Sequence, residues 1–349
     1  MTRQTIKTNY LQTIDWFNGN IIDWVSAGQQ YSLDGTQKQL AKYHYAFSFD
    51  GSITSQDGQY VFIYKRLGTK GILLKNGEMI REINRTYYHA ETYEFPAVFI
   101  TFDNKTYLVH CPINYCQLDF ENVETGEIVT NIPGRQPSDI FHSRFSISPD
   151  NKYLMVCGWA WHPVDTVELF DIAECFKNPL LLDKSFLYPD FGTEINSASF
   201  IDNERILIAS TDEEPFDDEV PPILPQKHIA IWNFTTNELS KPVKIDGEFG
   251  NLIAINDKQA WDMFKFPKII NIQTGKIESK LEEINSGLQT SSIMYGDIEK
   301  SPQICFDRQT SQIAIRIDNT MIEVLAPSQY GGLHRFGNMV AGRNTNEHL

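Results

Sequence analysis

Short polar turns between two apolar strands recur along this chain at a nearly constant spacing. The clearest example spans residues 145–156, where Ser148-Pro149-Asp150 separates two apolar segments. Turn centres of this kind lie near positions 19, 57, 103, 150, 202, 257 and 307, so neighbouring centres are on average ~48 residues apart. Asp, Asn and Gly suit such turns because they tolerate left-handed backbone or bond their own main chain. The spacing predicts about seven similar antiparallel units.

A second hairpin follows the first inside most units. Its turns are Asn76-Gly77, Thr125-Gly126, Thr236-Asn237 and Thr274-Gly275, and apolar strands such as residues 229–234 precede them. Two hairpins give each unit four strands, named a to d from the axis outward. Regular short strands with this period are typical of a β-propeller. We therefore predict an all-β fold, a single propeller of about seven four-stranded blades over residues 1–327.

In several turns and strand ends the chain resembles the WD-repeat and related propeller families. The similar residues are Ser148-Pro149-Asp150 in an a–b turn, and Phe170-Asp171 and Trp232-Asn233, where the WD family places Trp-Asp on strand c. The Gly-His pair of that family is absent from this chain. The resemblance covers residues 1 to about 327 and implies a propeller of this general kind.

The last unit is one strand short. After Asp307 only residues 312–317 and 321–325 form apolar strands before Pro327 ends the pattern. We expect the extended segment Thr2–Asn9 to supply the missing outer strand and to close the ring, because closure hides a sheet edge. Residues 328–349 are predicted to be a flexible C-terminal tail. Two separate domains are the alternative fold, but no Pro-, Ser- or Gly-rich linker divides the chain.

The charge and cysteine content narrow the classes of partner. A net charge of −15 repels phosphate backbones and anionic lipid, so we expect neither nucleic-acid nor membrane binding. The odd count of five cysteines and the absence of an apolar leader or span predict a cytoplasmic protein. Cys111 and Cys116 do not have the spacing of a zinc site. We predict no metal and no cofactor.

The loops on one face of the predicted ring differ from those on the other. In a propeller the b–c and d–a loops open on one face, and the a–b and c–d turns open on the opposite face. The turns are short and polar here, whereas the loops gather Tyr, Trp, Arg and His, residue types that supply binding hot spots. We expect another protein to bind this face. The predicted contact residues are Tyr87, Tyr88, His89, Tyr93, Arg135, His142, Arg144, Trp159, Trp161 and His162.

The longest insertion on this face is an acidic loop in the fifth unit. Six acids occupy eight positions, namely Asp212, Glu213, Glu214, Asp217, Asp218 and Glu219. The run lacks the alternating ligands and the glycine of a calcium loop, which leaves a solvated loop or a docking segment for a basic partner. The b–c loop of the second unit carries Lys65, Arg66 and Lys70 instead. We therefore expect a face that is electrically polarised.

No catalytic motif is present in the sequence. It contains no nucleophile elbow, phosphate loop, His-Glu-x-x-His or dinucleotide fingerprint. The sequence favours a non-catalytic protein-binding propeller, either a scaffold or an inhibitor or immunity-type factor. The alternative is an enzyme or small-ligand binder at the channel mouth, which would use a metal on His89, His142 and His162 or a histidine–carboxylate pair. The carboxylates would be Glu91, Glu94, Asp139 or Asp190. A structural module of a larger complex is a third interpretation.

Overall fold

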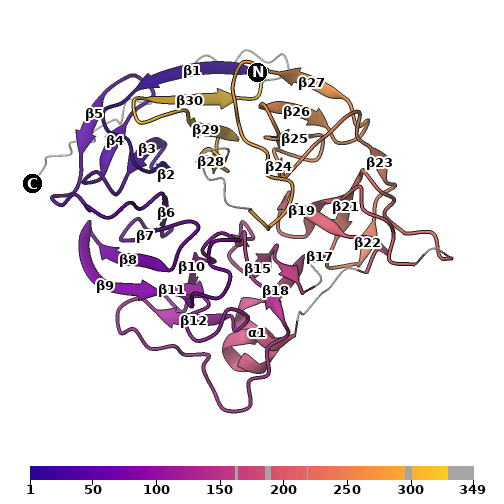
Figure 1. Cartoon of the computed structure of the whole chain (residues 1–349), viewed down its shortest axis with the longest axis horizontal. Coiled ribbons are helices and arrows are strands. Elements are labelled where there is room, and N and C mark those ends of the chain that lie inside the picture. The colour runs from indigo at the N-terminus through magenta and orange to yellow at the C-terminus, as the bar shows by residue number, and fades with distance from the viewer. Residues whose placement is uncertain (162–163, 185–189, 218, 295–300, 329–349) are drawn as a thin grey trace, which may run out of the picture.

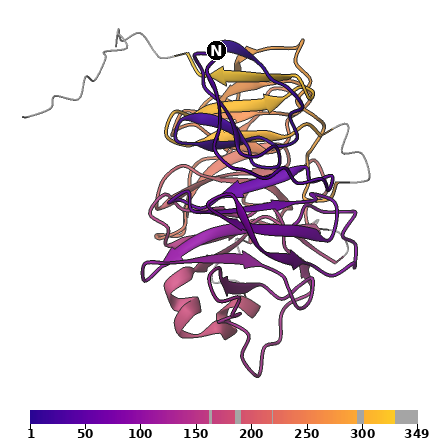
Figure 2. The same cartoon turned by 90° about the vertical axis from the view of Figure 1, so that its left-hand side faces the viewer.

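The computed structural model describes residues 1–161, 164–184, 190–217, 219–294 and 301–328. Within these ranges seven antiparallel sheets surround a common axis as blades, and an eighth, small sheet lies on one face. Figure 1 shows the ring down this axis, and Figure 2 shows it from the side. The expected all-β propeller is confirmed.

The first three blades follow one another along the chain, each built as a meander. The first blade contains β2 (Asp15–Phe17), β3 (Asn20–Asp23), β4 (Gln29–Tyr31) and β5 (Gln37–Gln39). The second contains β6 (Gly51–Thr54), β7 (Tyr60–Tyr64), β8 (Lys70–Lys75) and β9 (Glu78–Asn84). The third contains β10 (Val98–Phe102), β11 (Lys105–His110) and β12 (Asp119–Asn122).

The remaining blades continue around the ring. The fourth contains β14 (Ser146–Ile147), β15 (Tyr153–Val156) and β18 (Glu168–Asp171). The fifth contains β19 (Ile195–Phe200), β20 (Arg205–Ser210), β21 (His228–Asn233) and β22 (Glu238–Leu239), with β23 (Val243–Lys244) also paired to β21. The sixth contains β24 (Leu252–Ala254), β25 (Gln259–Asp262), β26 (Lys268–Asn271) and β27 (Ile277–Lys280). The seventh contains β28 (Ile304–Asp307), β29 (Gln312–Arg316), β30 (Met321–Ala326) and β1 (Thr2–Lys7).

The seventh blade joins the two ends of the propeller. Strand β1 pairs antiparallel with β30, and Thr2 lies opposite Ala326. This is the pairing expected for the segment Thr2–Asn9. Arg3 reinforces it, because its Nε and Nη2 donate to the two carboxylate oxygens of Glu323 at 2.9 and 2.8 Å. The side chain of Gln303 then links the seventh blade to the first by accepting from the backbone nitrogen of Ile14 at 3.1 Å.

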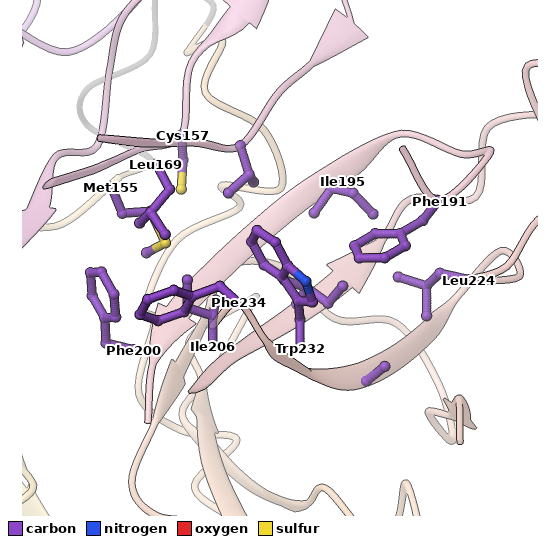
Figure 3. Close-up of a cluster of buried hydrophobic side chains, with 13 residues drawn as sticks. Met155, Cys157, Leu169, Phe191, Ile195, Phe200, Ile206, Leu224, Trp232 and Phe234 are labelled. Carbon is purple, nitrogen blue, oxygen red and sulfur yellow. The ribbon is translucent and has the colours of Figure 1, made fainter. Parts of the chain in front are cut away.

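The hydrophobic core lies between neighbouring blades. In the described residues one apolar cluster fills each of the seven gaps between adjacent sheets. Figure 3 shows the cluster between the fourth and fifth blades, where Trp232 packs near Phe191 and Phe234. Because every sheet buries both faces against its neighbours, a chain of this length needs no single large core.

Two blades depart from the four-strand pattern. In the third blade the outer strand is reduced to an isolated bridge between Glu121 and Ile128. In the fourth blade α1 (Ile172–Lys177) and the 3-10 helix η1 (Pro179–Asp183) follow β18 where a c–d hairpin is expected. Asp171, at the position of the WD-family aspartate, caps α1 by accepting from the backbone nitrogen of Glu174 at 3.0 Å. This helix was not predicted from the sequence.

The eighth sheet lies on the b–c/d–a face, beside the fourth blade. Its strands are β13 (Ile140–Phe141), β16 (Trp159–Ala160) and β17 (Val164–Asp165). Gly158, directly before β16, allows the chain to approach β13 closely, because a Cβ at this position would lie 2.3 Å from the carbonyl oxygen of Phe141. The predicted tail lies outside the described residues beyond Ser328. In the part of the chain that the structure describes, no helix has the length and apolar character of a membrane span.

Candidate functional site

Seven aromatic rings gather on the b–c/d–a face, and we call them the aromatic cluster. Phe141 of β13 is fully buried at its centre and stacks on Trp159 of β16 with ring centroids 3.9 Å apart. Tyr115 stacks on Phe141 at 4.5 Å, and Tyr93 meets the same ring edge-on at 5.4 Å. The members are Tyr88, His89, Tyr93, Tyr115, Phe141, Trp159 and Trp161.

The cluster has a buried base and an exposed rim. Tyr93 and Trp159 are buried with Phe141, whereas Tyr88 and Trp161 remain 48% and 46% exposed. His89 contacts both exposed rings, with centroid distances of 4.6 Å to Tyr88 and 5.7 Å to Trp161. Large rings that pack on a buried base offer contact area, and little side-chain conformational entropy is lost when a partner binds them. The exposed rings of the rim are therefore held in place by the buried base.

Arg85 holds the connection that carries three members of the cluster. Its guanidinium lies over the ring of Tyr93, 4.4 Å from the centroid. It also donates to the backbone carbonyls of Gly68, Ala90 and Tyr93 at 2.7, 2.7 and 2.8 Å. These bonds tie residues 85–95 to the second blade, so Tyr88 and His89 project from a fixed loop.

Five of the ten predicted contact residues belong to the aromatic cluster. They are Tyr88, His89, Tyr93, Trp159 and Trp161. Tyr87 is 81% exposed beside the cluster, and His162 lies outside the described residues. Tyr115 and Phe141 were missing from the predicted set, although both lie in loops on the same face as the predicted contact residues.

Arg135 lies inside the structure rather than on the binding face. Its side chain pairs with Asp119 at 2.9 Å and with Asp183 at 2.6 Å, and all three side chains are nearly inaccessible. It also donates to the carbonyls of Leu118 and Thr130. Burial raises the pKa of Asp119 above its ordinary value. Arg135 thus joins the third blade to η1.

His142 is also buried, next to the carboxyl group of Glu168. Its Nε2 donates to the carbonyl oxygen of Cys116 at 3.0 Å, which leaves Nδ1 unprotonated in the neutral ring. Nδ1 lies 3.6 Å from Oε2 of Glu168. Burial lowers the pKa of His142 to about 4 and raises the pKa of Glu168 to about 7. The pair is an internal feature of the fourth blade.

Arg144 ties together the inner ends of three blades. Its Nε donates to the carbonyl of Cys157 at 3.1 Å, and its Nη1 donates to the carbonyl of Asn196 at 2.8 Å. Nη1 also donates to Oδ1 of Asn251 at 2.5 Å. These partners belong to the fourth, fifth and sixth blades. Arg144 therefore stabilises the arrangement of the loops that form the face.

The connection between the sixth and seventh blades crosses the channel mouth, and we call residues 287–294 the crossing segment. Figure 1 shows the chain after β27 reaching the centre of the ring. The backbone nitrogen of Met294 donates to the carbonyl of Thr92 at 2.6 Å, on the second-to-third-blade connection. The backbone nitrogen of Ser292 donates to Asp165 of β17 at 3.0 Å. Ile293 packs against the aromatic cluster.

A pocket of about 950 Å³ opens between the crossing segment and the fourth to sixth blades, and we call it the acidic pocket. Its carboxylate lining consists of Asp165, Glu194, Asp212, Glu213, Glu214 and Glu248. Lys227 pairs with Asp212 at 3.1 Å, and Lys265 pairs with Glu248 at 2.5 Å. Burial raises the pKa of Glu194. The predicted acidic loop thus forms one wall of a pocket on the same face as the aromatic cluster.

The acidic loop is anchored to the blade at its base. The backbone nitrogen of Phe216 donates to the carbonyl of Gly192 at 3.2 Å, and Leu224 is fully buried in the core. Asp217 and Glu219 are exposed, and Asp218 lies outside the described residues. The polypeptide around the acids is therefore held against the fifth blade.

Two of the three cations expected to polarise the face are paired with carboxylates. Lys65 pairs with Asp50 at 2.6 Å, and Arg66 pairs with Glu94 at 3.0 Å. Arg66, Asp50 and Glu94 line a smaller pocket of about 250 Å³ on the other side of the crossing segment. Over the described ranges no three His, Cys, Asp or Glu side chains are placed to hold one metal ion.

Comparison with known proteins shows the fold class. No family model and no curated protein matches the chain. A chain from "Crystal Structure of Mitotic Checkpoint Complex" is similar, with a TM-score of 0.57 and 10% sequence identity over 92% of this chain and 90% of that chain. The likeness supports a WD40-like propeller fold. Because 995 chains match, the likeness identifies the architecture of the chain. It does not identify the function, which has to be argued from the residues of the site.

Proposed function

We propose that this chain is a non-catalytic protein-binding propeller, a scaffold or an inhibitor or immunity-type factor, that holds another protein on its b–c/d–a face. The observation that carries the proposal is the aromatic cluster. Tyr88 and Trp161 are about half exposed on a rigid base of Tyr93, Phe141 and Trp159. Exposed aromatic rings that are fixed in place and clustered are typical of interface hot spots.

The inward-facing predicted residues have a supporting role in this proposal. Arg135, His142 and Arg144 hold the loops, while Tyr88, His89 and Trp161 touch the partner, together with Tyr87 beside them. The five cysteines are all free, which suits a reducing compartment, and we propose a cytoplasmic location. The acidic net charge supports a protein partner over nucleic acid or anionic membrane.

Affinity capture from native lysate tests the proposal. The binding variant is Tyr88→Ala/Trp161→Ala, because Trp159 is only 4% exposed and its replacement would disturb the base. The matched control is Met79→Ala/Ile80→Ala on the outer strand β9, where the side chains are 50% and 38% exposed. Thermal melts establish that both variants are folded.

We expect a protein that is captured by the wild type and the control, and lost with the binding variant. Capture of the same proteins by all three forms would contradict the proposal.

A further inference from the structure

We propose that the acidic pocket receives arginine or lysine side chains from an extended segment of the partner protein. This inference rests on the proposed function and names the chemistry of the partner. It makes the acidic loop a recognition element instead of a solubilising one.

The free groups of the pocket are hydrogen-bond acceptors. In the described chain Glu213 and Glu214 have no lysine or arginine partner, unlike Asp212 and Glu248. Glu194 already accepts from the backbone nitrogen of Asp165 at 2.6 Å and from the hydroxyl of Thr211 at 3.3 Å. Ionised carboxylates only accept hydrogen bonds, so the complementary ligand must donate them. Arginine and lysine side chains are donors without acceptors, and they also neutralise the charge.

A buried amide in the pocket lining points to the same chemistry. Asn196 lines the pocket and is only 4% exposed. Its Nδ2 donates to the carbonyl of Thr290 at 2.7 Å, but its Oδ1 has no hydrogen-bond partner among the described residues. A buried acceptor without a donor is costly, and because Oδ1 is itself inaccessible, a guanidinium or ammonium group satisfies it only when the lining shifts to admit the donor.

The acceptors are spread along the pocket rather than gathered at one point. No three acidic, His or Cys side chains of the described residues are placed around a single ion. The volume of about 950 Å³ is at the upper end of small-ligand pockets and accommodates several side chains. Dispersed acceptors in a large pocket suit the planar fork of arginine, or two successive cations on an extended strand.

The acidic pocket and the aromatic cluster form one continuous surface. Ile293 lines the pocket and also packs against the cluster. Val164 and Asp165 of β17 line the pocket, and β17 pairs with β16, which carries Trp159. A segment with cations in the pocket therefore continues over the exposed ring of Trp161, where a further arginine or an aromatic residue can stack.

A defined peptide tests the inference directly. The probe is a fluorescein-labelled peptide of alternating arginine and glycine with one central tryptophan, titrated with the full chain and followed by fluorescence anisotropy. The pocket variant is Glu213→Gln/Glu214→Gln. The control is Glu82→Gln/Glu127→Gln, which removes the same charge at exposed carboxylates without a lysine or arginine partner in the described structure.

We expect saturable binding that is about fivefold to tenfold weaker in the pocket variant and changed less than about twofold in the control. Equal weakening of both variants would show that only the overall charge attracts the peptide, and it would overturn the inference. Absence of saturable binding to the wild type would overturn it as well.

The two proposals fail separately. A captured partner that is lost with Tyr88→Ala/Trp161→Ala but kept by Glu213→Gln/Glu214→Gln would overturn the basic-segment inference and leave the protein-binding function standing. If Tyr88→Ala/Trp161→Ala still captures every protein that the wild type captures, the proposed function is contradicted, regardless of the result with the peptide.

Discussion

Ser292 bonds twice to Asp165 from the opposite side of the channel mouth. Its backbone nitrogen donates to Oδ1 of Asp165 at 3.0 Å, and its hydroxyl donates to the same oxygen. Asp165 belongs to β17 of the small eighth sheet beside the fourth blade, whereas Ser292 follows the sixth blade. The pair fixes the crossing segment between the aromatic cluster and the acidic pocket, so the shape of both depends on it.

Replacing Ser292 by alanine is expected to loosen the crossing segment. The variant loses one hydrogen bond to a charged group, worth about 1.5–3 kcal/mol. Amide hydrogen exchange measured by mass spectrometry should therefore become faster in residues 288–294. Thr236→Ala, on an exposed turn of the fifth blade, is the control and should change nothing there. Unaltered exchange in the Ser292 variant would show that other contacts hold the segment.

Removal of residues 1–10 is expected to lower the melting temperature by on the order of 10 °C or more. The deletion removes β1 and leaves β30 as an open edge beside an exposed apolar gap. Circular dichroism melts measure the effect. Within β1, Ile6→Ala should cost about 2–4 kcal/mol because Ile6 is 4% exposed, and Thr2→Ala on the exposed face should cost under about 0.5 kcal/mol. A deletion with an unchanged melting point would sink this interpretation.

Arg135→Ala is expected to destabilise the fold by about 3–5 kcal/mol. The change leaves the buried carboxylates of Asp119 and Asp183 without their cation. Urea denaturation followed by tryptophan fluorescence measures the loss. Arg135→Lys keeps the positive charge but not the planar guanidinium with its several donors. The stability of this variant should therefore lie between those of the wild type and the alanine variant. A loss below about 1 kcal/mol would place Arg135 outside the stabilising network.

Glu168→Gln is expected to become more favourable, relative to wild type, as pH rises. Burial raises the pKa of Glu168 to about 7 from an ordinary value of 4.5. The folded state therefore holds this proton more tightly than the unfolded state. Its stabilising effect is complete below pH 4.5 and is lost as pH rises through 7, a change of up to about 3 kcal/mol. Glutamine has no proton to lose.

Urea denaturation at pH 5 and pH 8 measures this difference between the two proteins. His142 has the opposite dependence, because burial lowers its pKa to about 4. Its contribution is present above its ordinary value of 6.5 and is lost as pH falls through about 4. Both proteins contain His142, so their difference isolates Glu168. The same difference at both pH values would contradict the assignment.

The blades could be predicted because turn chemistry is local. Left-handed backbone occurs at Asn18, Asn104 and Asn151, which lie in three of the expected a–b turns. The missing strand of the last blade was also predictable. An extra extended segment precedes the first unit, and the last unit lacks its outer strand. Helix α1 was missed because Phe170-Asp171 was matched to the end of a c strand, after which a c–d hairpin was expected. The capping residue Asp171 and Pro179 at the start of η1 were signals of helix that the sequence contains.

The candidate site was predictable only in part. Composition located the loops that carry Tyr88, His89 and Trp161, but it could not show which side chains turn inward. Arg135 and Arg144 were expected at the binding face because they lie in its loops and arginine is common in binding hot spots. Only the structure reveals the carbonyls and carboxylates that bind them. Residues 287–294 are mostly small and polar and show no periodicity, so nothing in the sequence placed them over the channel.

The pairing of β1 with β30 also sets an order of events during translation. Strand β1 leaves the ribosome before its partner β30, which emerges some three hundred residues later, on the order of 15 to 60 s afterwards. Until then the apolar faces of the first and last blades cannot pack against each other and remain exposed. Nascent chains of this protein should consequently depend on chaperones until β30 emerges and pairs with β1.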